Sequence, residues 1–399
     1  MVFKQIEYIG KKFLVLILGF FLKQEKLTPK DVDLSSIKRI LVIRQDDRIG
    51  NLILTTPLLS ALRRFFPKAQ VTYLASKTFH TLFHNSSLVD QIFVAKKRQY
   101  IIHPLSLVSF IRRIRKQKFD LAFDASDENS FSLNNSFLAY LSGSRYRIGY
   151  KKPNSALFLN IEVPSLPPCS ELAPNHTVQE LACSEPFNFV QDKRSRTVEP
   201  IQRHAAEMHL DLLRFLVGDF EGDDLKIEVD PENRFSVKKY LEEKEILPDD
   251  FLIGINIGGR GRKRWDLENF IELADWIVED LDVKVIFIWG PEEKNMVKGI
   301  TLKNENKQIL SDLFPLPILA ALIERCNLFI SGDTGAMHLS SAVRTPTLAL
   351  FLDSDPTKFG PQGKTHKIIY SSNGKISVDI VEKAIKDMME STILVKENT

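Results

Sequence analysis

The sequence predicts an α/β protein built from two doubly wound, Rossmann-like domains that face each other across a cleft. Three observations predict this fold class. Apolar runs of five to seven residues alternate with helix-length segments, and the alternation occurs in two separate series. An acidic stretch separates the two series. The length of 399 residues suits two or three domains of about 150 residues each.

The first series of predicted strands and helices begins with a buried strand at Arg39–Arg44. A helix over residues 51–67 follows, and a basic helix is expected at Ser106–Phe119. After a helix at His204–Gly218, the acidic stretch 219–233 is interpreted as the connection between the domains. The other predicted strands of this series are 70–75, 90–95, 119–125 and 146–150.

The second series begins with a predicted strand at Phe251–Ile257. Further strands are expected at 283–290, 327–332 and 347–352, with helices at 269–281, 318–326 and 336–343. We therefore expect four parts. They are an N-terminal membrane-associating segment (1–36), a first Rossmann-like domain (37–222), a second one (223–375) and a C-terminal helix and tail (376–399).

The N-terminal segment contains the apolar run Phe13–Leu22, flanked by Lys11, Lys12 and Lys23. Its ten residues fall short of the ~20 that a membrane-spanning helix needs. No small-residue cleavage site follows, as it would in a signal peptide. We expect an interfacial anchor with its lysines at the lipid headgroups. A helix packed on the protein's own surface is the alternative.

The charge distribution also indicates a membrane. Residues 1–118 carry 22 Lys and Arg against 7 Asp and Glu, a balance of +15, whereas the remainder carries 32 against 44, a balance of −12. The basic half favours an anionic membrane surface, and solvated faces of opposite sign are the alternative. The basic helix at Ser106–Phe119 is a second candidate membrane-facing surface, unless its apolar face, with Leu107, Phe110, Ile111 and Ile114, packs on the core. No zinc-finger or RNP pattern supports nucleic acid binding.

The sequence offers no metal or disulfide pattern. Its three cysteines, Cys169, Cys183 and Cys326, are isolated, which fits a reducing compartment. His80 and His84 are four residues apart but lack the glutamate of a zinc protease motif and a third ligand. We expect no metal ion and no bound cofactor.

Two loops carry the chemistry that the sequence singles out. Gly332-Asp333-Thr334-Gly335 ends a predicted strand and opens a helix, where backbone N–H groups and the positive helix end favour phosphate. A companion loop follows the strand at 251–257, and it is also placed to open a helix. Together they suit a diphosphate, although a side chain that merely caps the helix would explain the turn as well. The companion loop contains Gly258, Gly259, Arg260, Gly261, Arg262, Lys263 and Arg264.

Four stretches in this order resemble glycosyltransferase family 9, which contains the ADP-heptose:lipopolysaccharide heptosyltransferases. They are RIGNLILTTPLLSALRRFFPKAQVTYL, KRWDLENFIELA, SGDTGAMHLSSAVRTPTLALF and FGPQG. The resemblance implies a GT-B fold with an N-terminal acceptor domain and a C-terminal nucleotide-sugar domain. It implies metal-independent, inverting transfer from a nucleoside-diphosphate sugar, typically ADP-heptose, to an anionic lipid-linked saccharide such as the lipopolysaccharide core. It places such a protein in the cytoplasm, at the inner face of the membrane.

The resemblance also assigns donor-binding residues. Lys263 matches the family's phosphate-binding lysine, with Arg264 as the neighbouring alternative. We expect the Thr334 and Gly335 amides to hold the diphosphate and Asp333 to accept hydrogen bonds from the sugar. His338 either lines the pocket or packs beneath it. Glu292 or Glu293 is expected to reach the ribose hydroxyls, unless it only caps a helix start. Gly258, Arg260 and Gly332 complete the expected donor site.

The chain departs from the family at the catalytic base. The family usually has Gly-Asp after the first strand, and here the pair is Gly50-Asn51. An amide cannot accept a proton as a general base. Asp47 or Asp46 is the nearest substitute by sequence, and two acids later in the same domain are further candidates. A weakly active or inactive nucleotide-sugar binding protein is the alternative function, and a nucleotide-sugar-processing enzyme such as an epimerase is another. The further candidate acids are Asp124 and Asp127.

Overall fold

A computed structural model of the chain describes residues 22, 24–46, 48–76, 80–95, 99–100, 103–128, 132–165, 189–191 and 203–397. These residues form two compact units. The first lies within Met1–Arg48, Leu54–Pro167 and Ala205–Asp223, and the second within Ile49–Ile53, Pro168–His204 and Asp224–Thr399. The expected anchor helix, of which only Leu22 is described, and Asp47, Cys169 and Cys183 lie outside the described residues.

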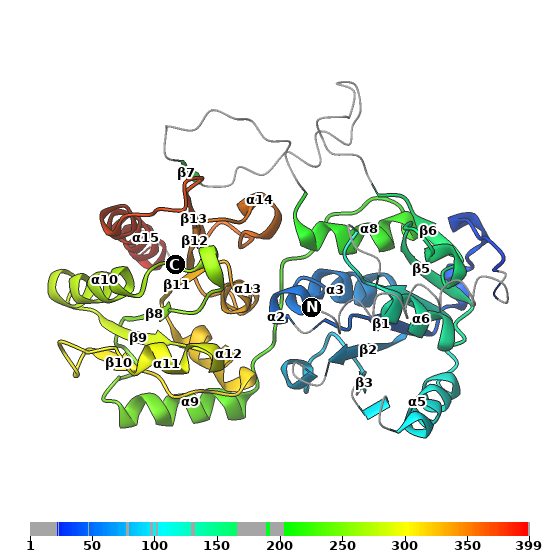
Figure 1. Ribbon diagram of the computed structural model, residues 1–399, viewed down its shortest axis with the longest axis horizontal. Coiled ribbons are helices and arrows are strands. Elements are labelled where there is room, and N and C mark those ends of the chain that lie inside the picture. The colour runs from blue at the N-terminus through cyan, green and yellow to red at the C-terminus, as the bar shows by residue number, and fades with distance from the viewer. Residues whose placement is uncertain are drawn as a thin grey trace, which may run out of the picture. The chain divides into compact units, whose positions relative to one another are not determined.

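The first unit is built on a six-stranded parallel sheet in the order β3-β2-β1-β4-β5-β6 (Figure 1). The strand order reverses between β1 and β4, which is the Rossmann arrangement. The strands are β1 (Arg39–Ile43), β2 (Gln70–Ser76), β3 (Gln91–Ala95), β4 (Leu121–Asp124), β5 (Tyr146–Tyr150) and β6 (Ile161–Val163). The helices are α3 (Thr56–Phe65), α5 (Pro104–Lys116), α6 (Leu133–Leu141) and α8 (Ala205–Val217).

The second unit repeats this arrangement with seven parallel strands in the order β10-β9-β8-β11-β12-β13-β7. Its strands are β7 (Phe189–Gln191), β8 (Leu252–Asn256), β9 (Lys284–Ile288), β10 (Gln308–Leu310), β11 (Leu328–Gly332), β12 (Thr347–Phe351) and β13 (Lys367–Tyr370). Its helices are α2 (Ile49–Ile53), α9 (Pro231–Glu243), α10 (Leu267–Asp280), α11 (Lys294–Val297), α12 (Leu316–Arg325), α13 (Gly335–Ala342), α14 (Pro356–Phe359) and α15 (Val378–Glu397).

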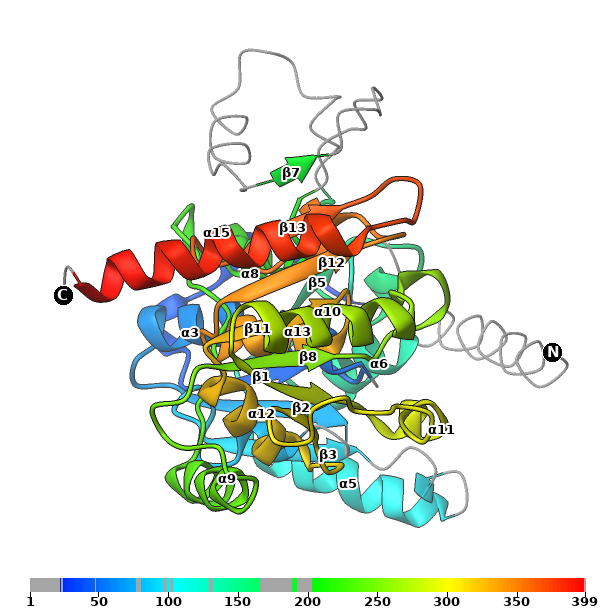
Figure 2. The same ribbon diagram turned by 90° about the vertical axis from the view of Figure 1, so that its left-hand side faces the viewer.

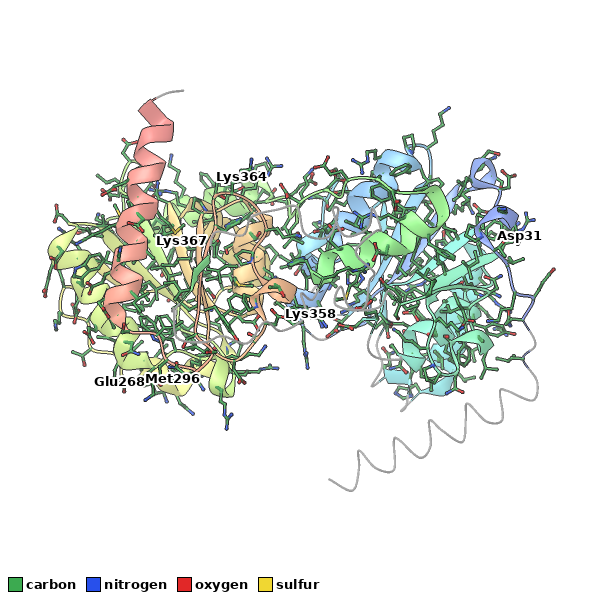
Figure 3. The ribbon with its side chains drawn as sticks, turned by 90° about the horizontal axis from the view of Figure 1, so that it is seen from above. Asp31, Glu268, Met296, Lys358, Lys364 and Lys367 are labelled. Atoms are coloured by element: carbon green, nitrogen blue, oxygen red, sulfur yellow. The ribbon has the colours of Figure 1, made fainter. Side chains whose placement is uncertain are left out.

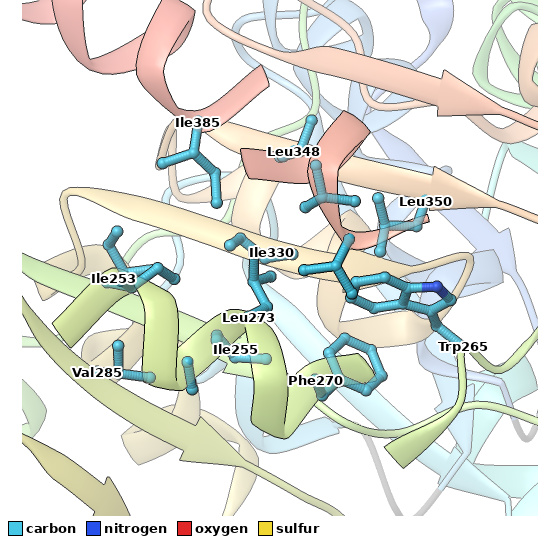
Figure 4. Packing of buried hydrophobic residues seen from close by; sticks show 14 of the residues in the cluster. Ile253, Ile255, Trp265, Phe270, Leu273, Val285, Ile330, Leu348, Leu350 and Ile385 are labelled. Carbon is cyan, nitrogen blue, oxygen red and sulfur yellow. The ribbon is translucent and has the colours of Figure 1, made fainter. Parts of the chain in front are cut away.

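Both faces of the second sheet are buried, and strand alternation divides its side chains between them. On one face Leu348 and Leu350 pack with α10 and α15 in a cluster that includes Phe270 and Ile385 (Figures 2 and 4). On the other face Ala349 and Phe351 pack with Met337 of α13. The strands therefore read as continuous apolar runs, which is why the sequence predicted them.

The structure corrects two expected elements. The helix predicted at 51–67 is broken into α2 and α3, because Pro57 lies in the first turn of α3 and a proline ring clashes with the carbonyl four residues earlier. The stretch 219–233, interpreted as the connection, is in part helical: α9 begins at Pro231 after its N-cap Asp230. None of the helices in the described part of the chain is long and apolar enough to cross a bilayer.

Candidate functional site

The turn between β11 and α13 forms the centre of the candidate site. Thr334 is the N-cap of α13, and its hydroxyl oxygen accepts a hydrogen bond from the Met337 N–H at 3.4 Å. The other N–H groups of the first turn have no acceptor within the helix, and the positive end of the helix dipole lies here. The backbone at this point therefore offers hydrogen-bond donors to an anion.

Lys263 and Asp333 form an ion pair beside this turn. The Lys263 ammonium group donates to Asp333 Oδ2 at 2.5 Å, with the Asp333 side chain 9% exposed and that of Lys263 39% exposed. Gly332 permits the approach of the two loops, because a Cβ there would lie 3.1 Å from the Lys263 carbonyl oxygen. Asp333 is expected to accept a hydrogen bond from a sugar hydroxyl. Because Lys263 already donates to one of its carboxylate oxygens, any such contact depends on Lys263 as well.

Asn256, which the sequence analysis missed, ties the two loops together. Its buried side chain donates to the hydroxyls of Ser331 (3.0 Å) and Thr334 (3.1 Å), and its Oδ1 accepts from the Gly258 N–H at 3.4 Å. A polar residue at the end of an otherwise apolar strand was the available signal. Asn256 fixes the N-cap threonine relative to the start of the companion loop.

Helix α2 packs directly on the start of α13, within the second unit. A Cβ on Gly335 would lie 1.9 Å from Ile49 Cγ2, and one on Gly50 would lie 2.6 Å from His338 Cδ2. Two glycines thus allow the close approach of the helices. Asn51, at the position where the family resemblance implies a base, lies on α2, the helix that packs on α13.

His338 packs beneath the turn rather than opening to solvent. It is buried, and its Nδ1 has no hydrogen-bond partner among the described residues. Burial lowers its pKa to about 4, although the nearby Asp333 carboxylate acts in the opposite direction. Burial also lowers the pKa of His204 and of His366 to about 4. The described part of the second unit thus contains these three buried imidazoles, whose lowered pKa values favour the neutral form near pH 7.

Four other expected donor-site residues contact groups away from the turn. Arg260 and Glu292 form an exposed two-pronged ion pair at 2.5 and 3.0 Å. Glu293 is buried and accepts from the Gly290 N–H at 3.0 Å, so it caps the short helix Pro291–Glu293. Arg264 points its Nη1 at the sulfur of Met296, which Figure 3 labels. Of the two glutamates, Glu292 is therefore the one exposed for a ligand.

The candidate bases of the first unit differ in how many hydrogen bonds their carboxylates already accept. Asp46 accepts from Arg44 Nη2 at 3.4 Å and from the Arg48 N–H at 3.0 Å. Asp124 is buried, and both of its oxygens accept hydroxyl hydrogen bonds, from Ser126 and Ser136. Both oxygens of Asp124 are therefore already occupied by hydrogen bonds within the protein. Among the residues that the structure describes, no group of three or more His, Cys, Asp or Glu is placed to hold a metal ion.

A family model described as "Glycosyltransferase family 9 (heptosyltransferase)" matches residues 107–386 of the chain. Lipopolysaccharide heptosyltransferase 3 of Escherichia coli (strain K12) is 23% identical over 327 residues, which cover 78% of this chain and 82% of that protein. The match to the family model extends across most of the described residues of the second unit and includes both loops of the candidate site.

Two solved structures share the fold. One is a glycosyl transferase family 9 protein from Veillonella parvula DSM 2008, with a TM-score of 0.71 and 25% identity, covering 89% of this chain and 97% of that one. The other is the E. coli ADP-heptose lps heptosyltransferase II, with a TM-score of 0.66 and 16% identity, covering 90% of this chain and all of that one. The expected pair of Rossmann-like domains of the GT-B type is thereby confirmed.

The contact between α2 and α13 predicts the effect of a single methyl group. We expect Gly335→Ala to lower the free energy of unfolding by about 1–3 kcal/mol, the usual cost of overpacking, because its Cβ would clash with Ile49 Cγ2. Adding Ile49→Ala should recover most of the loss. Urea unfolding measures both, with Gly299→Ala as the control, since a Cβ there meets its nearest neighbour at 3.5 Å. No rescue by Ile49→Ala would contradict this packing.

The buried histidines predict a loss of stability in acid. Their pKa values of about 4 lie below the value near 6.5 of an unfolded chain. The unfolded state therefore binds more protons between these two values, and the free energy of unfolding falls as the pH falls through this window. The slope is at most about 1.4 kcal/mol per pH unit for each histidine. Thermal unfolding across this range should show a shallower decline in His338→Gln. An identical decline in the variant would exclude His338.

Proposed function

The chain belongs to glycosyltransferase family 9, and from this membership we propose that it transfers heptose from ADP-heptose onto a lipid-linked saccharide such as the lipopolysaccharide core. The proposed transfer inverts the anomeric centre and uses no metal ion. The observation that carries the proposal is the ion pair of Lys263 and Asp333 at the N-terminus of α13. The names of the relatives, which refer to heptose transfer and lipopolysaccharide, support the choice of donor and acceptor.

In this proposal the diphosphate binds at the start of α13. The Thr334 and Gly335 amides donate to its oxygens, and the two N–H bonds of the Lys263 ammonium that do not serve Asp333 donate to them as well. Sharing Lys263 with a phosphate weakens its hold on Asp333, which can then accept from a sugar hydroxyl. Glu292, once released from Arg260, is the carboxylate exposed for the ribose hydroxyls.

The proposed reaction is a single displacement. The acceptor hydroxyl oxygen forms a bond to the anomeric carbon while the bond from that carbon to the phosphate oxygen breaks. The electron pair leaves with the nucleoside diphosphate, whose growing negative charge Lys263 and the helix N-terminus stabilise. The hydroxyl proton must pass to a base. Asn51 cannot take it, and the held carboxylate of Asp124 is poorly suited, so we propose Asp47, with Asp46 as the neighbouring alternative.

The proposed acceptor is anchored in a membrane, so we propose that the protein works in the cytoplasm as a peripheral protein at the inner face of the cytoplasmic membrane. The nucleotide sugar is its co-substrate, and no further cofactor is needed. A donor-binding protein without transfer is the second candidate function, because Asn51 replaces the acid that the family resemblance implies.

The donor site predicts a loss of affinity on removing one charge. Lys263→Met should weaken ADP-heptose binding about 10- to 100-fold, because a charge-assisted hydrogen bond contributes about 1.5–3 kcal/mol. Binding is read from the rise in thermal unfolding temperature with ligand, across a panel of nucleotide sugars; a hundredfold excess over Kd should stabilise the wild type by about 2.7 kcal/mol. Lys367→Met, which breaks a surface ion pair with Asp387, is the control. Equal affinity in the two variants would refute the site.

If Asp47 is the base, its removal should slow sugar transfer without weakening donor binding. Asp47→Asn should lower the transfer rate by about 10²- to 10⁴-fold, the usual contribution of a general base, with donor binding unchanged. Asn51→Asp should raise the rate by supplying an acid on α2. Radiolabelled or mass-detected transfer to a lipopolysaccharide-type acceptor measures both. Full transfer by Asp47→Asn would remove Asp47 from the mechanism. Transfer by Asn51→Asp alone, with none by the wild type, would favour the donor-binding alternative.

A further inference from the structure

Helix α5 has an outward face that the proposed function does not use. Phe110 and Ile114 on its inner side are buried against the first sheet, which fixes the orientation of the helix. Leu105 and Val108 on the opposite side are 83% and 42% exposed. Figure 1 shows α5 on the outside of the first unit. The structure thus separates a core face from a second, outward apolar patch that the sequence analysis had not distinguished.

The same outward face continues into basic residues. Arg112 and Lys116 follow Leu105 and Val108 at helical spacing, so all four lie along one side of α5. Both basic residues are exposed, and neither forms an ion pair with an acid in the described part of the chain. No Asp or Glu occurs between residues 91 and 119. The positive charge of this face is therefore not neutralised by neighbours in sequence.

Two further arginines border the face and are held by the protein. Arg113 lies over the rings of Phe93 and Phe110, 4.9 and 5.6 Å from their centroids. Arg115 donates from its Nε to the Leu141 carbonyl oxygen at 3.1 Å. These contacts hold two positive charges at fixed positions on either side of the outward face. The face is therefore a preformed basic surface.

We propose that this outward face of α5, Leu105, Val108, Arg112 and Lys116, docks the protein on an anionic lipid bilayer. Arg112 and Lys116 pair with lipid headgroups, and Leu105 and Val108 enter the boundary between headgroups and acyl chains. The inference deepens the proposed function, since it rests on the membrane-bound acceptor for its purpose. Its physical basis, exposed apolar side chains beside exposed cations, does not depend on which sugar is transferred.

The chemistry of the face favours a bilayer over nucleic acid. Phosphate contacts alone would be served by arginine and lysine, and they leave the two exposed aliphatic side chains in water. On a bilayer surface the headgroup phosphates pair with the basic residues, and the boundary with the acyl chains takes up the aliphatic side chains. A second copy of the chain is disfavoured because two such faces would bring like charges together.

The test measures how the full-length protein partitions onto vesicles by co-sedimentation. The vesicles contain phosphatidylcholine alone or an equal mixture with phosphatidylglycerol. Arg112→Gln with Lys116→Gln should lower binding to the anionic vesicles about 25-fold, since each basic residue contributes about fivefold near such a surface (~1 kcal/mol). Leu105→Ser with Val108→Ser should also weaken binding, and raising the salt should weaken what remains of the charge effect.

Matched variants on α9 provide the control. Lys238→Gln with Lys239→Gln removes the same charge from another exposed helix, and Phe235→Ser removes an apolar side chain that is 69% exposed. Every variant keeps the N-terminal apolar run, so differences report on α5 alone. Equal binding by the α5 and α9 variants, or binding of the wild type to neutral vesicles as strong as to anionic ones, would overturn the proposal.

Two more measurements distinguish other outcomes. Binding to a single-stranded RNA homopolymer that depends on Arg112 and Lys116, together with vesicle binding that does not, would assign the face to nucleic acid and overturn the proposal. Thermal stabilisation by the nucleotide sugar should be the same in the α5 variants as in the wild type. A failure of donor binding in all variants would count against the proposed transfer and leave the docking result to be read separately.

Discussion

Asp333 lies with its side chain largely withdrawn from water, between the positive end of α13 and the ammonium group of Lys263. A carboxylate in such a place is stabilised by both neighbours, so interactions within the protein itself hold the turn. In the proposed reaction a diphosphate competes with Asp333 for the same lysine. The ion pair then couples the two halves of donor recognition: the more Lys263 serves the phosphate, the more Asp333 can serve the sugar.

This coupling requires that both loops stay fixed relative to each other, and the buried side chain of Asn256 supplies that restraint. Its Nδ2 donates to the hydroxyl of the N-cap threonine of one loop, and its Oδ1 accepts from the Gly258 N–H of the other. The close approach of Gly332 to the Lys263 carbonyl oxygen also fixes the two loops, so the flexible lysine side chain can change partner without a movement of its backbone. The relative position of the two loops thus depends on Asn256 and Gly332 as well as on the ion pair.

The sequence was most informative where one local pattern decides the structure. Doubly buried strands such as β8 and β11 appear as apolar runs, and the turn after β11 combines strand, glycine and helix cap within a few residues. The sequence did not predict the short strands β10 and β13, because three or four residues carry little periodicity. It did not predict the helix α9 either, because α9 has few buried positions. The ion pair joins residues 70 positions apart, and only the parallel pairing of β8 with β11 brings them together.

The contact between α2 and α13 separates two roles that the Gly50-Asn51 pair combines. Gly50 is required by packing, because any Cβ there would meet His338, and Gly335 is required in the same way by Ile49. Neither requirement involves the side chain at position 51. In the proposed mechanism an asparagine can therefore stand in place of the acid while Gly50 and Gly335 still allow the contact between α2 and α13. We therefore expect donor binding and transfer to be separable, because in the proposed reaction position 51 bears on proton transfer, whereas the two glycines bear on the contact between the helices.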